Sequence, residues 1–274
     1  MAEPTDPPAP AAATTPVLLP AIAAATVVLL RAAPNGWELL LLERHAKTAF
    51  AGGAMVFPGG RVDPGDTAVA ADPALATGFA ALAPVDAAAR VAALREAFEE
   101  AGVVIAPGAT IDPDVRADWQ ARLNAGAATW GDFLRATGIR LEAAALVPFA
   151  HWVPPAAAPI ARRFDTLFFL AQLPPGATVT PDGGEAVAAH WTTPAAALAR
   201  ADAGAIGLVF PTRRNLERLA RYATIDALIA ATRTRPVVRI QPEIVARPDG
   251  PWLTIPVGCD YPVTEEALTA VRRE

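Results

Sequence analysis

The chain has 274 residues, of which 53% are hydrophobic and 19% are charged, and its formal net charge is −5 at pH 7. This composition is sufficient for a large buried core, and the negative charge argues against a nucleic-acid backbone as the main partner. The single cysteine, Cys259, excludes an internal disulfide bond and a zinc site built from several cysteines.

The N-terminal region predicts a tail followed by a β-hairpin. Residues 1–16 are rich in Pro, Ala and Thr without apolar periodicity, which predicts a disordered tail. The apolar run from Val17 to Leu30 spans 14 residues, contains a proline and has no cationic lead-in. A membrane-spanning helix needs about 20 apolar residues and a signal peptide begins with positive charge, so we predict a buried strand and no membrane segment. Asn35-Gly36 is a hairpin signal that joins this strand to the next.

The middle of the chain predicts an insertion followed by a helix. Two Xaa-Pro breaks interrupt an Ala-rich segment, so we expect residues 67–85 to form a loop or a small helical insertion. Asp86 suits the N-cap of a helix that continues to Ala101, and Gly102 suits its C-cap. Further helices are expected within residues 114–136, 194–203 and 211–232, and strands within residues 162–173, 185–193, 236–245 and 250–257. Strands in both hairpin and crossover contexts favour a mixed sheet surrounded by helices.

Three carboxylates lie on one face of the helix that ends at Ala101. Glu96, Glu99 and Glu100 have i, i+3 and i+4 spacing, which makes them neighbours that repel one another. The opposite face of the helix is apolar and is expected to pack against a core. Two interpretations follow: a solvated charged face in which Arg95 partly neutralises Glu99, or a site whose ligand is a cation.

The segment GRVDPGD, followed later by REAFEEAGV, resembles the Nudix box, in which a glycine and an acid precede the pattern R-E-U-x-E-E-x-G-U, where U is a bulky aliphatic residue. The sequence departs from that pattern at three points. The first acid is Asp66, the first aliphatic position holds Ala97, and 29 positions separate Asp66 from Arg95, far more than in the ordinary box. Such an insertion, with FPGG before it, is similar to the coenzyme A diphosphatase branch of the family, including its peroxisomal mammalian form. The segments LLLERH, RRFDTLFFLA and PTRRNLERLA resemble that branch as well.

The resemblance implies a Nudix fold, an α/β/α sandwich around a mixed β-sheet, over residues 17–204 with a C-terminal extension over residues 205–274. It implies metal-dependent hydrolysis of a diphosphate bond in a nucleoside diphosphate derivative, with coenzyme A or an acyl-CoA giving 3′,5′-ADP and a phosphopantetheine. Two alternatives stay open: hydrolysis of ADP-ribose or a dinucleotide, and a Nudix-shaped binding module without catalysis. The oligomeric state is not indicated. The chain ends in VRRE, unlike an S-K-L signal, so we expect a cytoplasmic protein.

The same resemblance assigns roles to individual residues. Mg²⁺ or Mn²⁺ would be held by Glu96, Glu99 and Glu100, with the Gly59 carbonyl as a further ligand. Asp66 is a further candidate metal ligand, but its role stays open because its side chain is one methylene shorter than that of a glutamate and the insertion changes its position in the motif. The catalytic acids would be Glu96, Glu99, Glu100 and Glu185, and of these Glu96, Glu99 or Glu185 could take the proton of the attacking water. Arg95, Gly60 and Gly102 would be structural, Arg95 through an ion pair that braces the loop against the helix. Arg44, Arg61 and Arg163 would contact substrate phosphates.

Other polar groups have two interpretations each. The segment with Arg162, Arg163 and Asp165 is either a phosphate clamp or an exposed strand end with its own ion pair. The basic helical face of Arg213, Arg214, Arg218 and Arg221 is either solvated or a contact for a 3′-phosphate or a second subunit. The histidines, His45, His151 and His190, are too scattered for a zinc site, and Trp152 is expected in the core rather than against an adenine.

Overall fold

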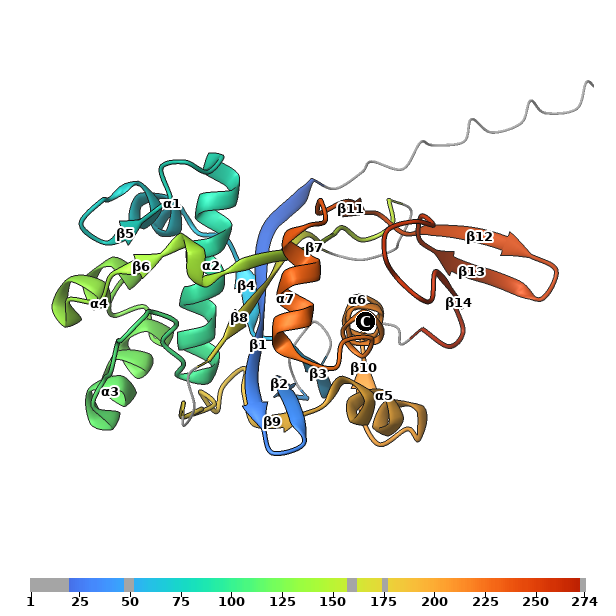
Figure 1. Cartoon of the computed structure of the whole chain (residues 1–274), viewed down its shortest axis with the longest axis horizontal. Coiled ribbons are helices and arrows are strands. Elements are labelled where there is room, and N and C mark those ends of the chain that lie inside the picture. The colour runs from blue at the N-terminus through green and yellow to red at the C-terminus, as the bar shows by residue number, and fades with distance from the viewer. Residues whose placement is uncertain (1–19, 47–51, 157–161, 174–176, 272–274) are drawn as a thin grey trace, which may run out of the picture.

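The computed structural model describes residues 20–46, 52–156, 162–173 and 177–271. The predicted disordered tail, residues 1–16, lies outside the described residues. Helices flank a mixed β-sheet on both sides (Figure 1), as the sequence predicted. Within the described ranges, none of the helices combines the length and the apolar character needed to cross a membrane.

The sheet is organised around β1 (Ala21–Ala33), which contains most of the predicted apolar strand. β1 forms the expected hairpin with β2 (Gly36–Arg44) and runs parallel to β8 (Arg163–Gln172) on its other side. The strand order is β10-β3-β2-β1-β8-β7-β11, with β4 paired to β1 and β9 paired to β2. The other strands of this sheet are β3 (Ala54–Val56), β4 (Gly59–Arg61), β7 (Val147–Trp152), β9 (Ala186–Thr192), β10 (Gly207–Leu208) and β11 (Arg239–Ile240).

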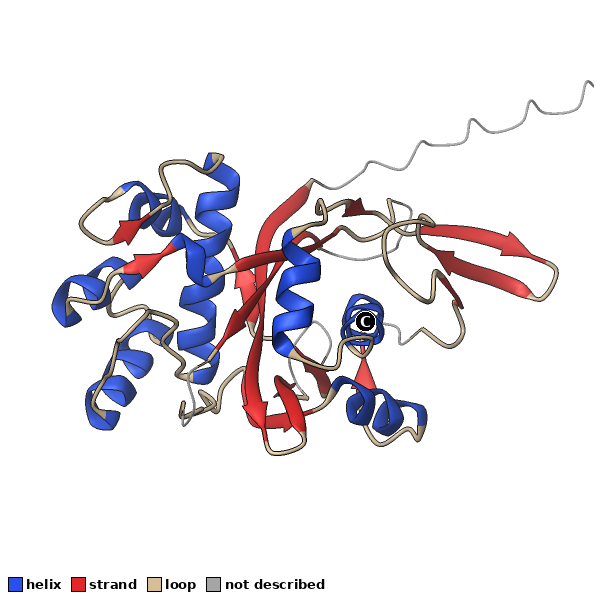
Figure 2. Ribbon diagram, viewed as in Figure 1, coloured by secondary structure: helices blue, strands red, loops and turns tan. Residues whose placement is uncertain are grey.

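Both faces of β1 are buried, because helices cover the sheet from each side (Figure 2). Val27 and Leu29 belong to the core covered by α2 (Pro84–Ala101). Val28 and Leu30 belong to a second core on the opposite face. That second core includes residues of α6 (Phe210–Leu219) and α7 (Ile225–Arg233). A strand with two buried faces reads as a continuous apolar run rather than an alternating one, which explains the sequence of this region.

The helix α2 begins earlier than predicted and ends where predicted. The prediction of Asp86 as N-cap is wrong: Ala83 is the N-cap and Pro84 follows at the first helical position. Proline is favoured there because its fixed φ suits the helix and the first N–H has no partner within the helix. Gly102 is the C-cap, with a φ of 64° in the left-handed region.

The predicted insertion contains most of α1 (Pro64–Ala71) and the strand β5 (Ala76–Thr77). β5 pairs with β6 (Leu141–Glu142), which anchors the insertion to the segment after α3 and α4. The helical zone expected within residues 114–136 is two helices, α3 (Pro113–Asn124) and α4 (Trp130–Thr137), followed by the 3-10 helix η1 (Ala143–Ala145). A turn at Gly126, with a φ of 67°, separates α3 from α4.

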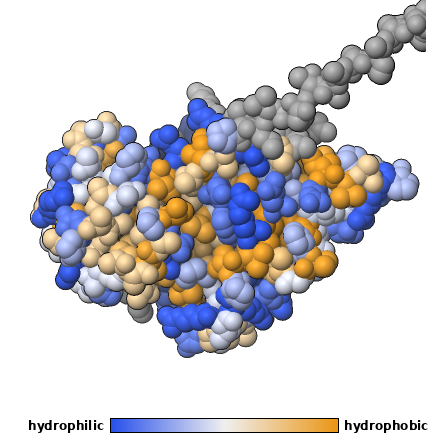
Figure 3. Space-filling view, turned by 90° about the horizontal axis from the view of Figure 1, so that it is seen from above, coloured by the Kyte–Doolittle hydropathy of each residue, from blue (hydrophilic) through white to orange (hydrophobic). Residues whose placement is uncertain are grey.

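The C-terminal third of the chain completes the sheet and its second core. After α5 (Pro194–Asp202), β10 pairs with β3 and β11 pairs with β7. Leu216 and Leu228, on α6 and α7, are fully buried. A ribbon of β12 (Glu243–Arg247), β13 (Gly250–Thr254) and β14 (Glu265–Ala267) projects from this side (Figure 1). On the face seen in Figure 3, hydrophobic residues lie among hydrophilic ones where the ribbon projects.

Replacing Phe133 by Ala should strongly destabilise the protein. Phe133 on α4 is fully buried, and its ring centroid lies 4.5 Å from that of Phe98 on α2 and 4.7 Å from that of Trp130. Loss of a buried phenyl ring costs about 3–5 kcal/mol, so the free energy of unfolding in urea should fall by that amount. Val115→Ala, at a position 44% exposed on α3, is the control and should change it by less than about 0.5 kcal/mol. Equal effects of the two variants would contradict the packing of α4 on α2.

Candidate active site

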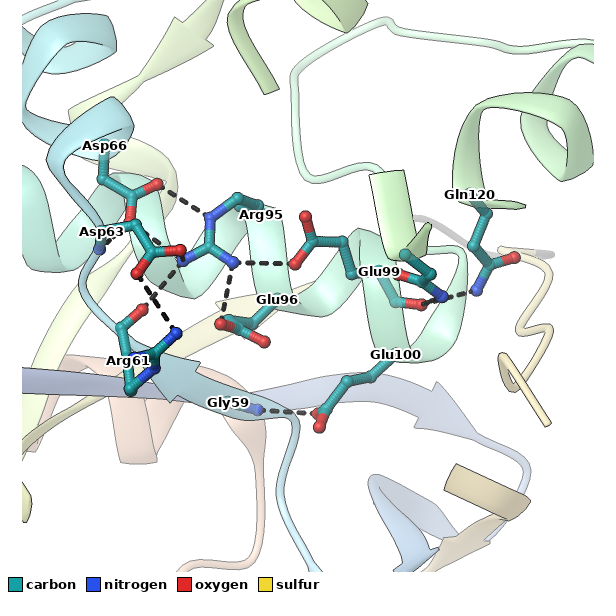
Figure 4. Close-up of polar contacts among 10 residues, drawn as sticks. Gly59, Arg61, Asp63, Asp66, Arg95, Glu96, Glu99, Glu100 and Gln120 are labelled. Atoms are coloured by element: carbon teal, nitrogen blue, oxygen red, sulfur yellow. Dashed lines mark hydrogen bonds and ion pairs between the residues drawn. The ribbon is translucent and has the colours of Figure 1, made fainter. Parts of the chain in front are cut away.

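The guanidinium of Arg95 lies at the centre of the split motif (Figure 4). Its Nε and Nη2 donate to the two carboxylate oxygens of Asp66, each at 2.9 Å, and Nη2 also donates to the Arg61 carbonyl at 2.8 Å. Its Nη1 donates to Glu96 at 2.8 Å and to Glu99 at 2.7 Å. One side chain therefore joins α1, β4 and the acidic face of α2.

Asp66 is only 1% exposed, and both of its oxygens serve structural contacts. Besides the ion pair with Arg95, its Oδ2 accepts the backbone N–H of Asp63 at 2.8 Å, which closes a capping box at the N-terminus of α1. Both oxygens of Asp66 are therefore engaged in contacts that hold α1 against α2, and its charge raises the pKa values of Glu96 and Glu99. A role of Asp66 near the metal stays a prediction.

The Gly59-Gly60 pair allows β4 to approach both β1 and the acidic face of α2. A Cβ on Gly60 would lie 2.4 Å from Oε1 of Glu96, and a Cβ on Gly59 would lie 2.5 Å from the carbonyl oxygen of Ala25. Both distances are well below those of ordinary non-bonded contacts. The Gly59 N–H donates to Oε2 of Glu100 at 2.9 Å. Only glycine therefore fits at these two positions without displacing a neighbouring group.

Burial disfavours the charged forms of all three glutamates. Burial raises the pKa of Glu96 to about 7, against the lowering effect of Arg95 and with a further increase from the charge of Glu99. Burial also raises the pKa of Glu99, which Arg95 opposes. Burial and then the charge of Glu96 raise the pKa of Glu100 well above its usual range. A cation among these carboxylates would relieve both the desolvation and the mutual repulsion.

The donor chemistry of this cluster fits a hard divalent cation. Mg²⁺ and Mn²⁺ prefer carboxylate and carbonyl oxygens, and the acidic face of α2 beside β4 supplies these groups. Among the described residues, no three acidic, histidine or cysteine side chains are placed to hold a metal ion together. Glu96 and Glu99 instead both bond to Arg95.

Arg44 and Glu185, two further predicted site residues, lie beside Glu100. The Arg44 side chain is 15% exposed, and its Nη2 lies 3.4 Å from Oε2 of Glu185. Its buried Nε has no hydrogen-bond partner within the described ranges. The charge of Arg44 lowers the pKa of Glu100 and that of Glu185 raises it, although both effects are smaller than that of burial. Arg44 is thus placed to bind an anionic group next to Glu100.

Two residues that were not predicted as site residues, Asp182 and Gln120, hold this site in place. Asp182 accepts the backbone N–H groups of residues 184–186 at 2.8–3.1 Å, which fixes the turn that carries Glu185. Gln120 on α3 donates to the Glu99 carbonyl at 2.9 Å near the C-terminus of α2. An aspartate before Gly-Gly is a turn signal that could have indicated the first contact. The second depends on how α3 packs and has no local signal.

Arg61 and Arg163 make other contacts. The Arg61 side chain is 63% exposed and lies 3.8 Å from Asp63. Arg163 lies at the start of β8, opposite Ala21, and its Nη2 donates to the Pro154 carbonyl at 3.1 Å. Their contacts with substrate stay predictions, whereas Arg44 already lies beside the carboxylates.

Two remaining sequence interpretations concern the far edge of the sheet. His151 bonds to one oxygen of Asp165, and Arg239 donates to the other at 3.1 Å. Asp165 thus belongs to an ion pair at the strand end, which was one of its two interpretations. Trp152 is 3% exposed and its Nε1 donates to the hydroxyl of Tyr261 at 3.0 Å, which agrees with a core position.

Replacing Gly60 by Ala should weaken metal binding and preserve the fold. The new methyl group would displace the Glu96 carboxylate, which is the end of a flexible side chain and can move without unfolding the protein. Affinity for Mg²⁺ or Mn²⁺, measured by titration calorimetry, should fall about 10–100-fold, as when the support of a metal ligand is disturbed. Gly65→Ala is the matched control, because no atom lies within 4 Å of a Cβ at that position. Unchanged affinity in the Gly60 variant would exclude Glu96 from the metal site.

The metal-free protein should lose stability as the pH rises from about 5 to about 7. Between the ordinary pKa of a glutamate and the raised pKa of Glu96, about 7, the folded state binds more protons than the unfolded state. The free energy of unfolding therefore falls with rising pH, and Glu96 alone accounts for about 3 kcal/mol of that fall. Urea denaturation in EDTA across this interval measures the effect, and Glu96→Gln should make the fall smaller without abolishing it, because the pKa values of Glu99 and Glu100 are raised as well. A stability that rises with pH, or that the variant leaves unaltered, would contradict the burial of this charge.

Comparison with known proteins places the chain in a family. A family model described as the NUDT19 Nudix domain matches residues 73–219. The human acyl-coenzyme A diphosphatase NUDT19 is 31% identical over 247 residues, covering 71% of this chain and 63% of the human protein. The Xenopus laevis protein of the same name is 25% identical over 287 residues, covering 86% of this chain and 76% of its own length. The chain thus spans less than two thirds of the human relative.

A solved structure supports the same conclusion. The crystal structure of a Nudix hydrolase from Alicyclobacillus acidocaldarius is 30% identical in sequence and superposes with a TM-score of 0.68, covering 78% of this chain and 97% of that protein. The predicted α/β/α fold and the resemblance carried by the split box are both confirmed. The chain therefore belongs to the Nudix family, with a Nudix domain of the NUDT19 type.

Proposed function

We propose that the chain is a divalent-metal-dependent hydrolase that cleaves the diphosphate bond of coenzyme A or an acyl-CoA to give 3′,5′-ADP and a phosphopantetheine. The name of its human and Xenopus relatives, acyl-coenzyme A diphosphatase, supports this substrate. The observation that carries the proposal is the cluster of buried Glu100 and half-buried Glu96 and Glu99 on one face of α2, with Glu96 against Gly60, in which burial raises all three pKa values. Hydrolysis of a diphosphate depends mainly on positioning and charge neutralisation, for which such a cluster is suited once it holds a cation.

Glu96, Glu99 and Glu100 would hold the cation, which we propose to be Mg²⁺ or Mn²⁺, with the Gly59 carbonyl as a further ligand. When bound, the cation supplies charge neutralisation for the diphosphate and lowers the pKa of a water molecule. Arg95 orients the cluster, because its Nη1 bonds to both Glu96 and Glu99 and limits how far each side chain can rotate.

Arg44 and Glu185 would act on the substrate and the attacking water. The buried Nε of Arg44 has no partner within the described ranges, and a phosphate oxygen would complete its hydrogen bonds. The side chain of Glu185 is 65% exposed and, unlike Glu96 and Glu99, makes no bond to Arg95. We therefore assign Glu185 the role of proton acceptor, through Oε1, since its Oε2 faces Arg44.

The composition of the chain bears on its partner and its location. A net charge of −5 argues against a nucleic-acid partner. Local arginines can still hold a small anionic substrate. We propose a cytoplasmic location, with which a chain containing a single cysteine is compatible.

Glu100→Gln should abolish turnover of coenzyme A and preserve the fold. The neutral amide resembles the protonated acid that burial favours, and its oxygen can still accept the Gly59 N–H, but it supplies no charge to a cation. Release of 3′,5′-ADP in Mg²⁺ or Mn²⁺, followed by chromatography, should fall about 100-fold or more. Glu142→Gln, at an exposed position on β6, is the control and should retain full activity.

The same assay with ADP-ribose and a dinucleotide distinguishes the alternatives. Cleavage of either one in place of coenzyme A would keep the chemistry and reject the proposed substrate. If none of the three is cleaved by a folded protein that binds the metal, the enzymatic proposal is wrong for these substrates and a binding function is favoured.

A further inference from the structure

A cavity of about 700 Å³ lies among β7, α6 and the loop between β13 and β14. Phe149, which lines it, belongs to the second core, so the cavity is on the face of the sheet opposite α2. Its charged lining consists of three arginines and one aspartate: Arg218, Arg221, Arg235 and Asp260. The cavity therefore has an excess of two positive charges in a chain whose net charge is −5.

All three arginines contact the same carboxylate. The Nε of Arg218 lies 3.2 Å from Oδ2 of Asp260, and the Nη1 of Arg221 lies 2.7 Å from Oδ1. Arg235 also bonds to Oδ2 through its Nη1. Burial would raise the pKa of Asp260, but the hydrogen bond from Arg221 and the charges of the arginines lower it. Asp260 is thus ionised at neutral pH and neutralises one of three positive charges.

Two of these guanidinium groups keep unused donors. Within the described ranges, every side-chain hydrogen bond of Arg221 and Arg235 runs through Nη1, to Asp260 and, for Arg235, to the hydroxyl of Tyr222. Their side chains are 45% and 41% exposed. Their Nε and Nη2 groups are therefore available to an anion that enters the cavity.

The remaining lining is rigid. Arg218 is 7% exposed at its side chain, donates to the Phe149 carbonyl at 2.9 Å and lies over the Phe149 ring at 4.3 Å. Asp260 has a φ of 65°, in the left-handed region that few non-glycine residues adopt. Local strain of this kind is retained where the surrounding contacts determine it, often at binding sites. Arg218 and Asp260 are thus held in place before any ligand binds.

We propose that this cavity binds a small phosphate monoester at a site separate from the acidic cluster of α2. Guanidinium groups donate paired hydrogen bonds to phosphate oxygens, and an excess of two positive charges matches a phosphate dianion. Pro236, Val237 and Val238 form an apolar wall that can carry the body of the ester. The proposal does not depend on the hydrolytic activity, because β1 and β8 separate β7 from β2 and the two sites lie on opposite faces.

A purely structural role makes a different prediction. If the arginines only tether the loop of Asp260 to α6 and α7, phosphate esters should have no effect on the cavity. Cys259 distinguishes these cases, because it lines the cavity and is the only cysteine in the chain. The rate at which this thiol reacts with N-ethylmaleimide, followed by mass spectrometry, therefore reports on the cavity alone.

The experiment measures this rate in EDTA, with AMP as the probe. AMP should slow the reaction in a saturable manner, and it should do so equally in Glu100→Gln, which separates this result from failure of the proposed hydrolase. Replacing both Arg221 and Arg235 by Gln should raise the AMP concentration needed for protection about tenfold or more. Arg218 still pairs with Asp260 in this double variant, which keeps the loop attached. Arg233→Gln, at an exposed position of α7 outside the cavity, is the matched control and should behave like the parent protein.

Three results would overturn the proposal. Adenosine, which lacks the phosphate, could protect Cys259 as well as AMP does. Potassium chloride at equal ionic strength could give the same protection. The double variant could retain the AMP dependence of the parent protein. Each would show that the phosphate does not bind to these guanidinium groups.

Discussion

The guanidinium of Arg95 is the contact on which the rest of the site depends. It donates to Asp66 from two nitrogens and to Glu96 and Glu99 from the third. Because Asp66 is 1% exposed, removal of Arg95 would leave a buried charge with only the Asp63 N–H to stabilise it. The same ion pair joins the two halves of a motif that are 29 positions apart in the sequence. An insertion can therefore lengthen this loop without separating its ends.

The distribution of that one positive charge explains the electrostatics of the acidic face. Arg95 serves Glu96 and Glu99 through a single nitrogen, whereas the Glu100 side chain has a hydrogen bond only from the Gly59 backbone among its described contacts. Burial then raises the pKa of all three acids, and the Arg95 guanidinium opposes this at Glu96 and Glu99. The fold thus places three acids whose charged forms are disfavoured beside a glycine pair, and the positive charge of Arg44 lies next to Glu100 and Glu185.

Local patterns predicted the parts of this arrangement that lie within one element. The i, i+3, i+4 spacing placed Glu96, Glu99 and Glu100 on one face, and Gly102 ended the helix as expected. The contact of Asp66 with Arg95 was not predictable, because it requires the path of α1, which the sequence of the insertion does not specify. The contact of Gln120 with α2 likewise depends on tertiary packing. The start of α2 was misjudged because a proline at the first position competed with an acidic N-cap candidate.

The apolar strands at the centre of the sheet determine where ligands can bind. Leu39 and Leu41 of β2 belong to one core and Leu40 and Leu42 to the other, so neither face of this strand is open. Polar ligands must then bind where short strands or loops leave the sheet. The acidic cluster lies beside β4 and the start of β9, and the arginine-lined cavity lies beside β7 at the other side. Residues of the C-terminal third close the second core and also supply Arg218, Arg221 and Arg235, so the segment that completes the fold also creates the positively charged cavity.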